Sequence, residues 1–482
     1  MASEELLKAA VAGRQGTVID GYALGERLNA GGTGYVYRVG APPGRDPGFP
    51  LAMKLPAVGR GEPLEGIVGF EMELMIHPAL TGPHVPRLVA SGSLRTVPYL
   101  VMELVEGRGL VEWVERAPLA ADEVARVGAA LADALQALHA QEVVHHDVKP
   151  ENVIVRPDAT AVLLDFGFAH HARYPDLLAE EMRFAAGSAP YVSPEQLRGL
   201  RGDSRSDLFS LGAMLYELAV GERPFGEPNT AAGMRDRLWR IPTPPRGIRP
   251  DVPPWLQEII LRCLEPDVQS RYQSAALVAF DLRNPAQVDL TIRSRRLRAP
   301  GLLGQARRWW RARDPARLAA LPPAPQPARV IMIAVDTSHP DDTRHPSIQW
   351  HARQAISTTA EHRVMCVSVV RAPALGEGPA LGDTESGRQL DHLVRLGRWA
   401  EPLGLPPERL SLHVVQSADP AATLVELARS NHVDLIVLGA PAPSEKPLAW
   451  WRSVASGVTA AARCSVLVVR APGEPDARGE PG

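Results

Sequence analysis

Two short stretches contain residues whose types and spacing suit phosphoryl transfer. The stretch HHDVKPENVIV contains Asp147, Lys149 and Asn152, and the stretch VLLDFGF places Asp165 directly after an apolar run. Moving a phosphoryl group from ATP to a hydroxyl requires an acceptor for the hydroxyl proton, neutralisation of phosphate charge and in-line positioning. Asp147 suits the first task and Lys149 the second. Asn152 and Asp165 offer the hard oxygen atoms that Mg²⁺ prefers.

These stretches resemble the catalytic loop and the DFG motif of the eukaryotic-type protein kinase family. The matching residues are Asp147, Lys149, Asn152, Asp165, Phe166 and Gly167. The resemblance implies that Asp147 and Lys149 are catalytic and that Asn152 and Asp165 bind metal. It also implies that ATP and Mg²⁺ are the cofactors and that protein hydroxyls are the substrates.

A glycine-rich stretch, LNAGGTGYV, resembles the loop with which the same family covers the ATP phosphates. Asn29 stands where the family has its first glycine, and we expect the loop to persist with altered stiffness because Asn tolerates positive φ. The following LAMK places Lys54 where the family's phosphate-binding lysine lies on a strand. The ATP-binding residues that the resemblance implies here are Leu28, Asn29, Ala30, Gly31, Gly32, Thr33, Gly34, Tyr35, Val36 and Lys54.

The lysine needs a carboxylate from the next helix, and GFEMELMIHPAL offers both Glu71 and Glu73. Residues two apart on a helix point in different directions, so only one can face the lysine. The resemblance favours Glu73 and leaves Glu71 as a solvated carboxylate. Next, YLVMELVEGRGL resembles the strand and hinge that hold adenine, which implies ATP contacts from Met102 and from the segment Glu103 to Val105.

Three later motifs imply structural roles in the same family. GSAPYVSPEQL resembles the end of the activation segment, and SDLFSLGAMLYEL resembles a helix that supports the catalytic loop through Asp207. SRYQSA supplies Arg271 as the expected partner of Glu195. Lys149 and Ser188 match the pattern of serine/threonine kinases rather than tyrosine kinases.

His146 stands where most family members have an arginine that binds a phosphate on the activation segment. The segment 168–186 contains no Ser or Thr, and its only hydroxyl is that of Tyr174. The two departures agree, so we expect activity without phosphorylation of this segment. His146, with His170 and His171, would make the site respond to pH if it titrated, whereas neutral hydrogen-bonded histidines would not.

The elements that must position these residues follow from the chain's periodicity. Short strand-like runs fill the first hundred or so residues, and ADEVARVGAALADALQALHAQ then repeats apolar residues at helical spacing. After the linker-like LPPAPQPAR, five runs rich in β-branched residues alternate with helical patterns: VIMIAV, RVMCVSVV, LSLHVVQ, VDLIVLG and CSVLVVR. This alternation predicts a parallel, doubly wound sheet.

The second unit resembles the universal stress protein family, whose fold often binds ATP at its topological switch point. Asp336 matches that family's acidic residue near the nucleotide. The spacing of the family's phosphate loop falls on Gly439, Ala442, Arg452 and Ser453, so two of its three glycines are missing. Nucleotide binding and a structural or dimerising role both stay open, and the family's habit of pairing through its last strand implies a homodimer through 464–469.

The composition limits the classes of protein. Net charge is −3, which gives no field that points toward nucleic acid. The three cysteines are scattered, outside any metal-ligand spacing, and we expect them in hydrophobic cores. No apolar run approaches the roughly 20 residues needed to cross a bilayer, and the first residues do not resemble a signal peptide. We therefore expect a cytoplasmic protein without membrane contact.

The sequence thus predicts a two-lobed α+β protein kinase fold followed by an α/β domain. The boundaries that we expect are a kinase domain at 1–285 with its small lobe to about 104, an Arg/Trp/Pro-rich linker at 286–327, a universal stress protein-like domain at 328–472 and a flexible tail at 473–482. The linker, with Trp309 and Trp310, is either an interdomain helix or a basic segment that binds a partner or an acidic membrane surface. The function expected is a serine/threonine protein kinase in stress or signalling. The alternative is a nucleotide-binding pseudokinase scaffold or sensor.

Overall fold

The structure is a computed structural model of the whole chain, from which two structural units can be described. The first unit ends at residue 299 and the second begins at residue 329. The described residues are 16–31, 34–56, 65–92, 97–181, 187–228, 231–299, 329–339, 342, 344–357, 362–370, 385–440 and 454–470.

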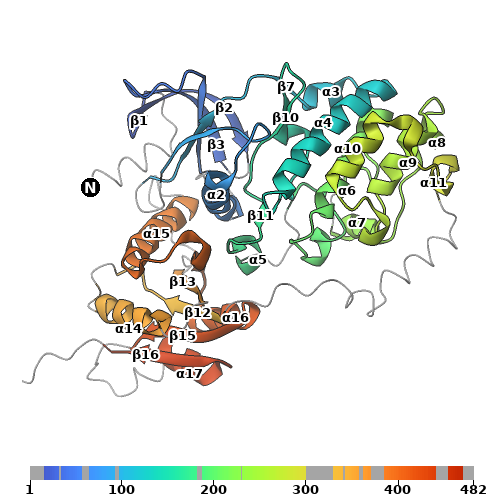
Figure 1. Ribbon diagram of the computed structural model, residues 1–482. Helices are drawn as coiled ribbons and strands as arrows, with labels where there is room; N and C mark the ends of the chain where they lie inside the picture. Colours follow the sequence, from blue (N-terminus) through green and yellow to red (C-terminus); the bar gives the residue numbers. More distant parts are fainter. Residues whose placement is uncertain are drawn as a thin grey trace, which may run out of the picture.

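The first unit begins with an antiparallel sheet in the order β1-β2-β3-β4-β6-β5 (Figure 1). Its strands are β1 (Val18–Ile19), β2 (Tyr22–Gly31), β3 (Gly34–Gly40), β4 (Leu51–Leu55), β5 (Leu88–Ser91) and β6 (Leu100–Glu103). Tyr37, Met53 and Val101 belong to the buried core of this small lobe. Helix α2 (Glu65–Ile76) lies beside the sheet, and its Met72 and Ile76 belong to the core of the following lobe.

The large lobe is built around four helices, α4 (Ala121–His139), α6 (Arg205–Val220), α9 (Pro254–Cys263) and α10 (Ala275–Arg283). Helix α4 buries the apolar side of its pattern, as expected for a helix with one face on a core. Fifteen residues of α6, from Ser206 to Val220, are buried, so α6 runs through the centre of this lobe. The remaining short helices and strands connect this framework and carry the loops described below.

These connecting elements are α3 (Val111–Glu115), α5 (Leu177–Glu181), α7 (Ala231–Arg235), α8 (Pro245–Ile248), α11 (Ile292–Arg295), β7 (Arg108–Gly109), β8 (Val143–Val144), β9 (Val153–Val155), β10 (Ala161–Leu163) and β11 (His170–His171). Strands β9 and β10 form a hairpin that joins β7, and β11 pairs with β8. Helix α11 packs on α9, where Arg293 pairs with Glu258. The first part of the predicted linker therefore belongs to the large lobe.

The second unit is a five-stranded parallel sheet in the order β14-β13-β12-β15-β16. Its strands are β12 (Arg329–Ala334), β13 (His362–Val370), β14 (Leu410–Gln416), β15 (Val433–Gly439) and β16 (Ser465–Val469). Its helices are α14 (His345–Ser357), α15 (Glu385–Ala400), α16 (Pro420–Ser430) and α17 (Val454–Ala461). The predicted doubly wound parallel sheet is confirmed.

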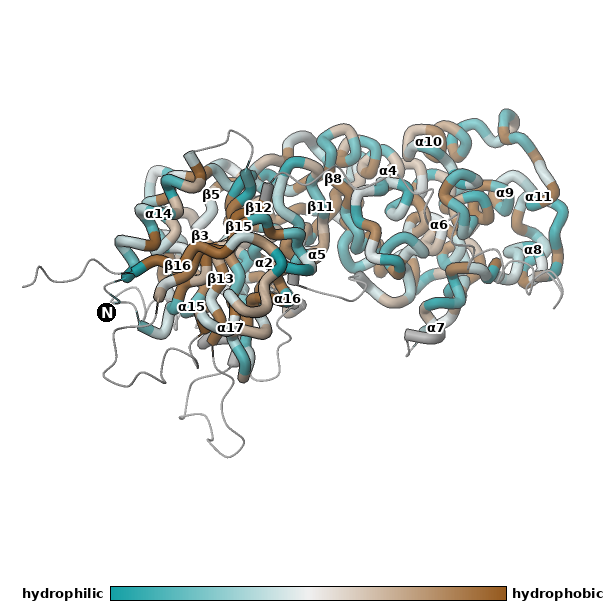
Figure 2. Tube along the Cα trace, turned by 90° about the horizontal axis from the view of Figure 1, so that it is seen from below, coloured by the Kyte–Doolittle hydropathy of each residue, from teal (hydrophilic) through white to brown (hydrophobic). Residues whose placement is uncertain are grey.

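Helices cover both faces of this sheet, which explains why its strands are hydrophobic on both sides. On one face, Ile348 of α14 and Leu390 of α15 join the core with Ile333 and Cys366. On the other face, Leu424 of α16 and Val458 of α17 join a separate core. Figure 2 shows hydrophobic residues along the strands between these layers.

The two units touch at α5 and α2 of the first unit. Helix α5 contacts both α2 and α16, and Ile67 of α2 lies in the apolar cluster of the second unit. Figure 1 shows α15 directly beneath α2. Trp309, Trp310 and most of the predicted linker lie outside the described residues, as does the tail after residue 470. Across the described ranges, no helix combines the length and the apolar character that a membrane span requires.

Candidate active site

Lys54 and Glu73 form the buried ion pair that the sequence predicted. Lys54 lies on β4, between β3 and β6, and its Nζ donates to a Glu73 carboxylate oxygen and to Asp165 Oδ1, the latter at 2.9 Å. The side chains of Lys54 and Glu73 are 5% and 1% exposed. Burial works to lower the pKa of Lys54, but the carboxylates of Asp165 and Glu73 outweigh it and raise that pKa, so the lysine stays charged.

Glu71 differs from the sequence expectation. Its residue is only 5% exposed, so it is not a solvated carboxylate. It lies on α2, the helix that the second unit contacts through Ile67. Helix geometry indicated that only one of the two glutamates faces the lysine, and the resemblance correctly favoured Glu73, but neither could reveal that a distant part of the chain covers this helix.

The loop that carries Asp147 is tied together by short polar contacts. Lys149 Nζ lies 2.7 Å from Asp147 Oδ2 and donates to Ser188 Oγ at 2.9 Å. The Ser188 hydroxyl and backbone N–H both donate to Asp147 Oδ1, at 2.8 and 2.9 Å. Asn152 Nδ2 donates to Asp147 Oδ2 at 3.0 Å. Three residues from two motifs, Lys149, Asn152 and Ser188, thus fix the orientation of one carboxylate.

Asp207 holds this loop from below, as expected. It accepts hydrogen bonds from the backbone N–H groups of His145 and His146, both at 2.9 Å, and its Oδ2 lies 2.8 Å from His139 Nε2. Burial works to raise the pKa of Asp207, but the hydrogen bond with His139 and the charges of nearby histidines lower it to about 2. Asp207 is therefore an ionised anchor inside α6.

A cleft between the two lobes brings together most of the predicted ATP-binding residues. Its predicted members are Asn29, Gly34, Val36, Lys54, Glu73, Met102, Glu103, Leu104, Val105, Asn152 and Asp165. Sequence reasoning missed six others: Ala52, His77, Pro86, Glu151, Ile154 and Leu164. The alternation of β4 and β9 could have indicated Ala52 and Ile154, because Ala52 shares a strand face with Lys54.

The hinge contributes less hydrogen-bonding capacity than expected. The N–H groups of Glu103 and Leu104 already donate to the carbonyls of Arg87 and Pro50, at 2.9 and 2.8 Å. Among the described residues, no acceptor contacts the N–H of Val105. The carboxylate of Glu103 accepts hydrogen bonds from Arg156 and Arg87, at 2.7 and 3.0 Å. Burial works to raise the pKa of Glu103, but these hydrogen bonds lower it. The pair with Arg156 also holds the hinge to the end of β9.

The glycine-rich hairpin is formed by β2 and β3, with Asn29 paired to Val36. Asn29 has an extended backbone with a negative φ, so the positive φ that Asn tolerates does not occur here. A Cβ atom at position 34 would lie 2.4 Å from the Leu55 carbonyl oxygen. This distance is too short, so the close packing on β4 explains why residue 34 is a glycine. Leu28, Ala30, Gly31 and Tyr35 lie on the hairpin outside the cleft lining. Gly32 and Thr33 lie outside the described residues.

Phe166 fixes the position of Asp165. Its ring is fully buried and packs edge-on to His77, at 5.4 Å between ring centroids, and against His145 at 5.3 Å. Asp165 itself adopts a φ of 62° and accepts from the Gly167 N–H. The large lobe is closed by Arg271 and Glu195, which form the predicted bidentate pair at 2.7 and 2.9 Å.

The second unit places Asp336 and Gly439 at the carboxyl ends of the neighbouring strands β12 and β15. The Asp336 carboxylate is 46% exposed and accepts from the Ser338 N–H and the His339 ring. Sequence reasoning missed Arg344, which donates to the Ala440 carbonyl at 2.9 Å and pairs with Asp342. Ala442, Arg452 and Ser453 lie outside the described residues.

The geometry agrees with two family models. The model of the protein kinase domain matches residues 22–281, which is more than half of the chain. The chain belongs to the protein kinase family. The model of the universal stress protein family matches residues 327–470, so the second unit is a universal stress protein domain. The first unit is called the kinase domain below and the second the stress protein domain.

Similar proteins come from several bacteria. Over 215 residues the chain is 39% identical to the serine/threonine-protein kinase Pkn1 of Myxococcus xanthus, covering 42% of this chain and 30% of that protein. Over 273 residues it is 32% identical to PknB of Mycolicibacterium smegmatis, covering 55% and 42%. A probable serine/threonine-protein kinase of Clostridium perfringens is 32% identical over 214 residues, covering 44% and 31%. The chain spans about a third of the length of these relatives.

His146 of the kinase domain is a buried neutral residue. Its Nε2 contacts the Arg201 carbonyl, and burial, aided by the Arg201 charge, lowers its pKa to about 3. Burial also lowers the pKa of His170 and of His171. These directions favour the neutral, hydrogen-bonded alternative for all three histidines over a pH response near neutrality.

Arg201, which sequence reasoning missed, ties the activation segment to the large lobe. Its guanidinium donates to Asp176 Oδ2 at 2.7 Å and to the carbonyl oxygens of Phe168 and Ala169, at 2.8 and 3.3 Å. Tyr174 is half-buried, with its ring 4.5 Å from that of His171. An internal carboxylate, Asp176, thus occupies one arginine that could otherwise bind a phosphate.

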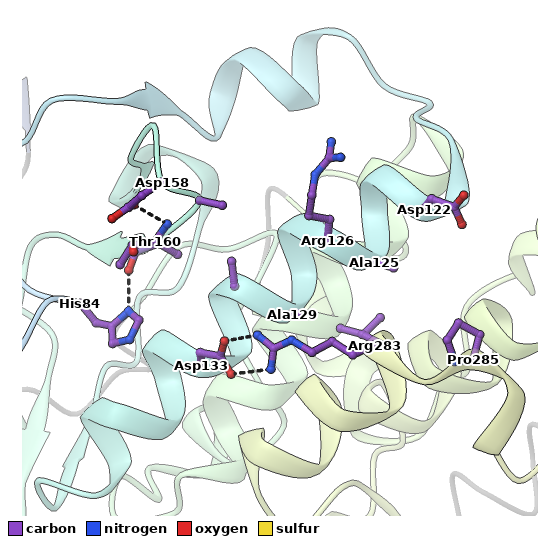
Figure 3. Close-up of a pocket in the computed structure, with 14 residues that line it drawn as sticks. His84, Asp122, Ala125, Arg126, Ala129, Asp133, Asp158, Thr160, Arg283 and Pro285 are labelled. Atoms are coloured by element: carbon purple, nitrogen blue, oxygen red, sulfur yellow. Dashed lines mark hydrogen bonds and ion pairs between the residues drawn. The ribbon is translucent and has the colours of Figure 1, made fainter.

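A second hollow of the kinase domain lies on the large lobe, between α4, α10 and the β9–β10 turn (Figure 3). Three of its polar side chains have partners within or next to the hollow. Arg283 pairs with Asp133, His84 Nδ1 lies 2.8 Å from the Ala161 carbonyl oxygen, and Asp158 accepts from the Thr160 N–H at 2.9 Å. None of its lining residues belongs to the cleft that contains Lys54, so we assign it no part in the site.

Proposed function

We propose that this protein is a serine/threonine protein kinase that transfers the γ-phosphoryl group of ATP to protein hydroxyls. The observation that carries the proposal is the joint presence of two arrangements at one cleft. Lys54 is held between Glu73 and Asp165, and Asp147 is held by Lys149, Asn152 and Ser188. A scaffold that no longer transferred phosphate would not require both arrangements.

Each residue has a role that its contacts support. Asp147 accepts the proton of the substrate hydroxyl, because Lys149, Asn152 and Ser188 orient its carboxylate. Lys149 neutralises charge on the transferred group. Lys54, oriented by Glu73, binds phosphate oxygens, and the free Val105 N–H suits an adenine acceptor. The apolar walls of the cleft, including Val36, Ala52 and Ile154, suit a flat aromatic base.

The donor set of the cleft fits Mg²⁺. Asn152 and Asp165 both line it and offer amide and carboxylate oxygens, the ligands that this ion prefers. Asn152 uses its Nδ2 toward Asp147, which leaves its oxygen for a cation. When bound, Mg²⁺ would be held by Asn152 and Asp165 and would neutralise the charge of the phosphate. Among the described residues no group of three metal-ligating side chains is preassembled, in keeping with an ion that enters with its nucleotide.

Activity without phosphorylation of the activation segment is part of the proposal. Three observations support it: His146 is neutral, the segment lacks Ser and Thr, and Asp176 already pairs with Arg201. At Arg201, a phosphate would have to displace the Asp176 carboxylate. The Arg201 contacts to Phe168 and Ala169 instead hold the beginning of the segment directly.

The presence of the stress protein domain supports a role in stress signalling, and its edge strand supports the formation of a homodimer. Strand β16 is an edge strand whose Val468 is 37% exposed, and pairing with a second copy would cover that edge. A nucleotide site at the switch point between β12 and β15 would use Asp336, Gly439, Arg452 and Ser453.

Radiolabel transfer from γ-labelled ATP with Mg²⁺ tests the proposal. We expect label on the protein itself and on a generic basic protein, with Ser and Thr favoured over Tyr in matched peptides. Asp147→Asn should lower the rate by about 10²- to 10⁴-fold, the usual contribution of a positioned proton acceptor. Asp158→Asn, at an exposed turn, is the matched control and should act as wild type. ATP binding without transfer under any metal would favour the scaffold instead.

A further inference from the structure

Arg363 and His413 of the stress protein domain lie on one face of its sheet. Arg363 shares a strand face with Met365 and Val367, since side chains alternate along β13. His413 of β14 is in register with Val367 and therefore lies on the same face. That face is mainly apolar, with Ser411 as a further buried polar residue, and it is covered by α16 and α17. A cation and an imidazole in such a place require polar partners.

The kinase domain provides that partner. Glu180 of α5 makes an ion pair with Arg363, and its Oε2 lies 2.9 Å from His413 Nε2. The Glu180 side chain is 8% exposed and that of His413 is fully buried. The backbone carbonyl of Glu180 also accepts from Asn431, at 3.5 Å. Glu180 of the activation segment thus contacts two strands of the other domain through its carboxylate and a loop through its backbone carbonyl.

The contact is transmitted to the active site through short helices. Leu177 and Leu178 of α5 are buried in the same core as Val68 and Met72 of α2. Helix α2 carries Glu73, which orients Lys54. If α5 moved, α2 would therefore lose packing close to Glu73, the residue that pairs with Lys54.

Two further contacts act on the same elements. Ile67 of α2 is 3% exposed because it packs in the apolar cluster of the stress protein domain. Asp176 of the activation segment, which binds Arg201, also interacts electrostatically with Arg363. Burial lowers the pKa of Arg363, and the negative charge of Asp176 raises it. Both elements that must be positioned for phosphoryl transfer thus meet the stress protein domain.

We propose that the stress protein domain is a built-in activator of the kinase domain, with Arg363 and His413 as positioning residues that hold α5 through Glu180. The docked arrangement coexists with the Lys54–Glu73 pair, so docking favours the catalytically competent state. This inference rests on the proposed kinase function. A buried carboxylate that loses its partners is strongly disfavoured, so loss of Arg363 or of His413 should release α5.

Steady-state kinetics of the full-length protein test the proposal. Couplings between sites commonly change an equilibrium about 5- to 150-fold, so we expect kcat to fall about tenfold in Arg363→Ala and Glu180→Gln. The KM for ATP should change less, because the cleft residues are untouched. The effects should not add in the double variant, since both remove one interaction. Arg353→Ala, on α14 of the same domain, is the matched control and should keep wild-type kcat.

Hydrogen exchange provides a measurement that does not depend on activity. Amides of α5 and α2 should exchange faster in Arg363→Ala and Glu180→Gln than in wild type and Arg353→Ala. Unchanged exchange in these helices, or a kcat within twofold of wild type in both interface variants, would overturn the inference. An inactive wild-type protein with the expected exchange pattern would instead sink the kinase proposal and leave the contact standing. Since Glu180→Gln keeps the shape of the side chain, it remains informative where Arg363→Ala does not fold.

Discussion

Arg271 and Glu195 show how much one residue pair can contribute when water is excluded. Their side chains are 0% and 1% exposed, and Arg271 also donates to the carbonyls of Glu265 and Arg205. Removing one member leaves the other charge buried without its partner, which typically costs 3–5 kcal/mol. We expect Arg271→Leu to lower the free energy of unfolding of the kinase domain by about 4 kcal/mol in urea titrations.

The matched control for Arg271→Leu is Arg240→Leu, because Arg240 pairs with Asp236 at the surface, with side chains 52% and 39% exposed. Exposed pairs of this kind contribute about 0.3–0.5 kcal/mol. Equal losses in the two variants would contradict the assignment of Arg271 as the anchor of the large lobe.

His146 predicts a dependence of stability on pH. Its pKa of about 3 in the folded protein lies below the ordinary 6.5, so the unfolded chain binds a proton that the folded protein does not. The free energy of unfolding therefore falls as pH falls below 6.5. The effect reaches about 1.4 kcal/mol per pH unit. Between pH 6.5 and 5, His146→Gln should lose about 2 kcal/mol less stability than wild type.

Urea midpoints at several pH values check this expectation. His339→Gln, at a residue whose side chain is 74% exposed, controls for the loss of a histidine as such. A wild-type slope that persists in His146→Gln would assign the acid sensitivity to other groups.

At the scale of elements, the activation segment is held without phosphate. Treatment with a phosphatase should leave kcat unchanged, because Asp176 already neutralises Arg201 and the segment has no Ser or Thr. Arg201→Ala should lower kcat about tenfold, since it removes three hydrogen bonds that together hold the segment, each worth about 1.5 kcal/mol or more when charged. Radiolabel transfer rates measure both effects. A large loss after phosphatase treatment, traced to Tyr174 or Ser188, would disprove the first.

Elements with a strong local pattern were predictable from the sequence. The five strands of the stress protein domain follow from runs of β-branched residues, and α4 follows from helical spacing, because periodicity records which face is buried. Lys54, Asp147 and Asp165 follow from motifs whose chemistry is local. The burial of Glu71 and the roles of Arg201 and Arg363 were not predictable. The partners of Arg201 and Arg363 are distant in sequence, and no local pattern records a contact between separate elements.

At the scale of the whole molecule, the active site lies between the two lobes of the kinase domain, and the helices that join its parts also contact the stress protein domain. The small lobe contributes Lys54 and Glu73, and the large lobe contributes Asp147 and Asp165. The stress protein domain touches the two helices that connect these contributions, α2 and α5. If two chains assemble through the stress protein domain, a movement of that domain would therefore act on α2 and α5 of the same chain.

Strand β16 is where that assembly is expected. It pairs with β15 on one side only, and its Val468 is exposed on the sheet edge. Unpaired edges with apolar side chains favour pairing with another strand, whereas a charge at the edge opposes it. We expect wild type to sediment at twice the chain mass of 52.0 kDa and Val468→Lys to sediment as a monomer. Ser465→Lys at the end of the strand is a milder control. A wild-type monomer at micromolar concentration would contradict dimerisation through β16, and it would leave activation within one chain as the sufficient role of the stress protein domain.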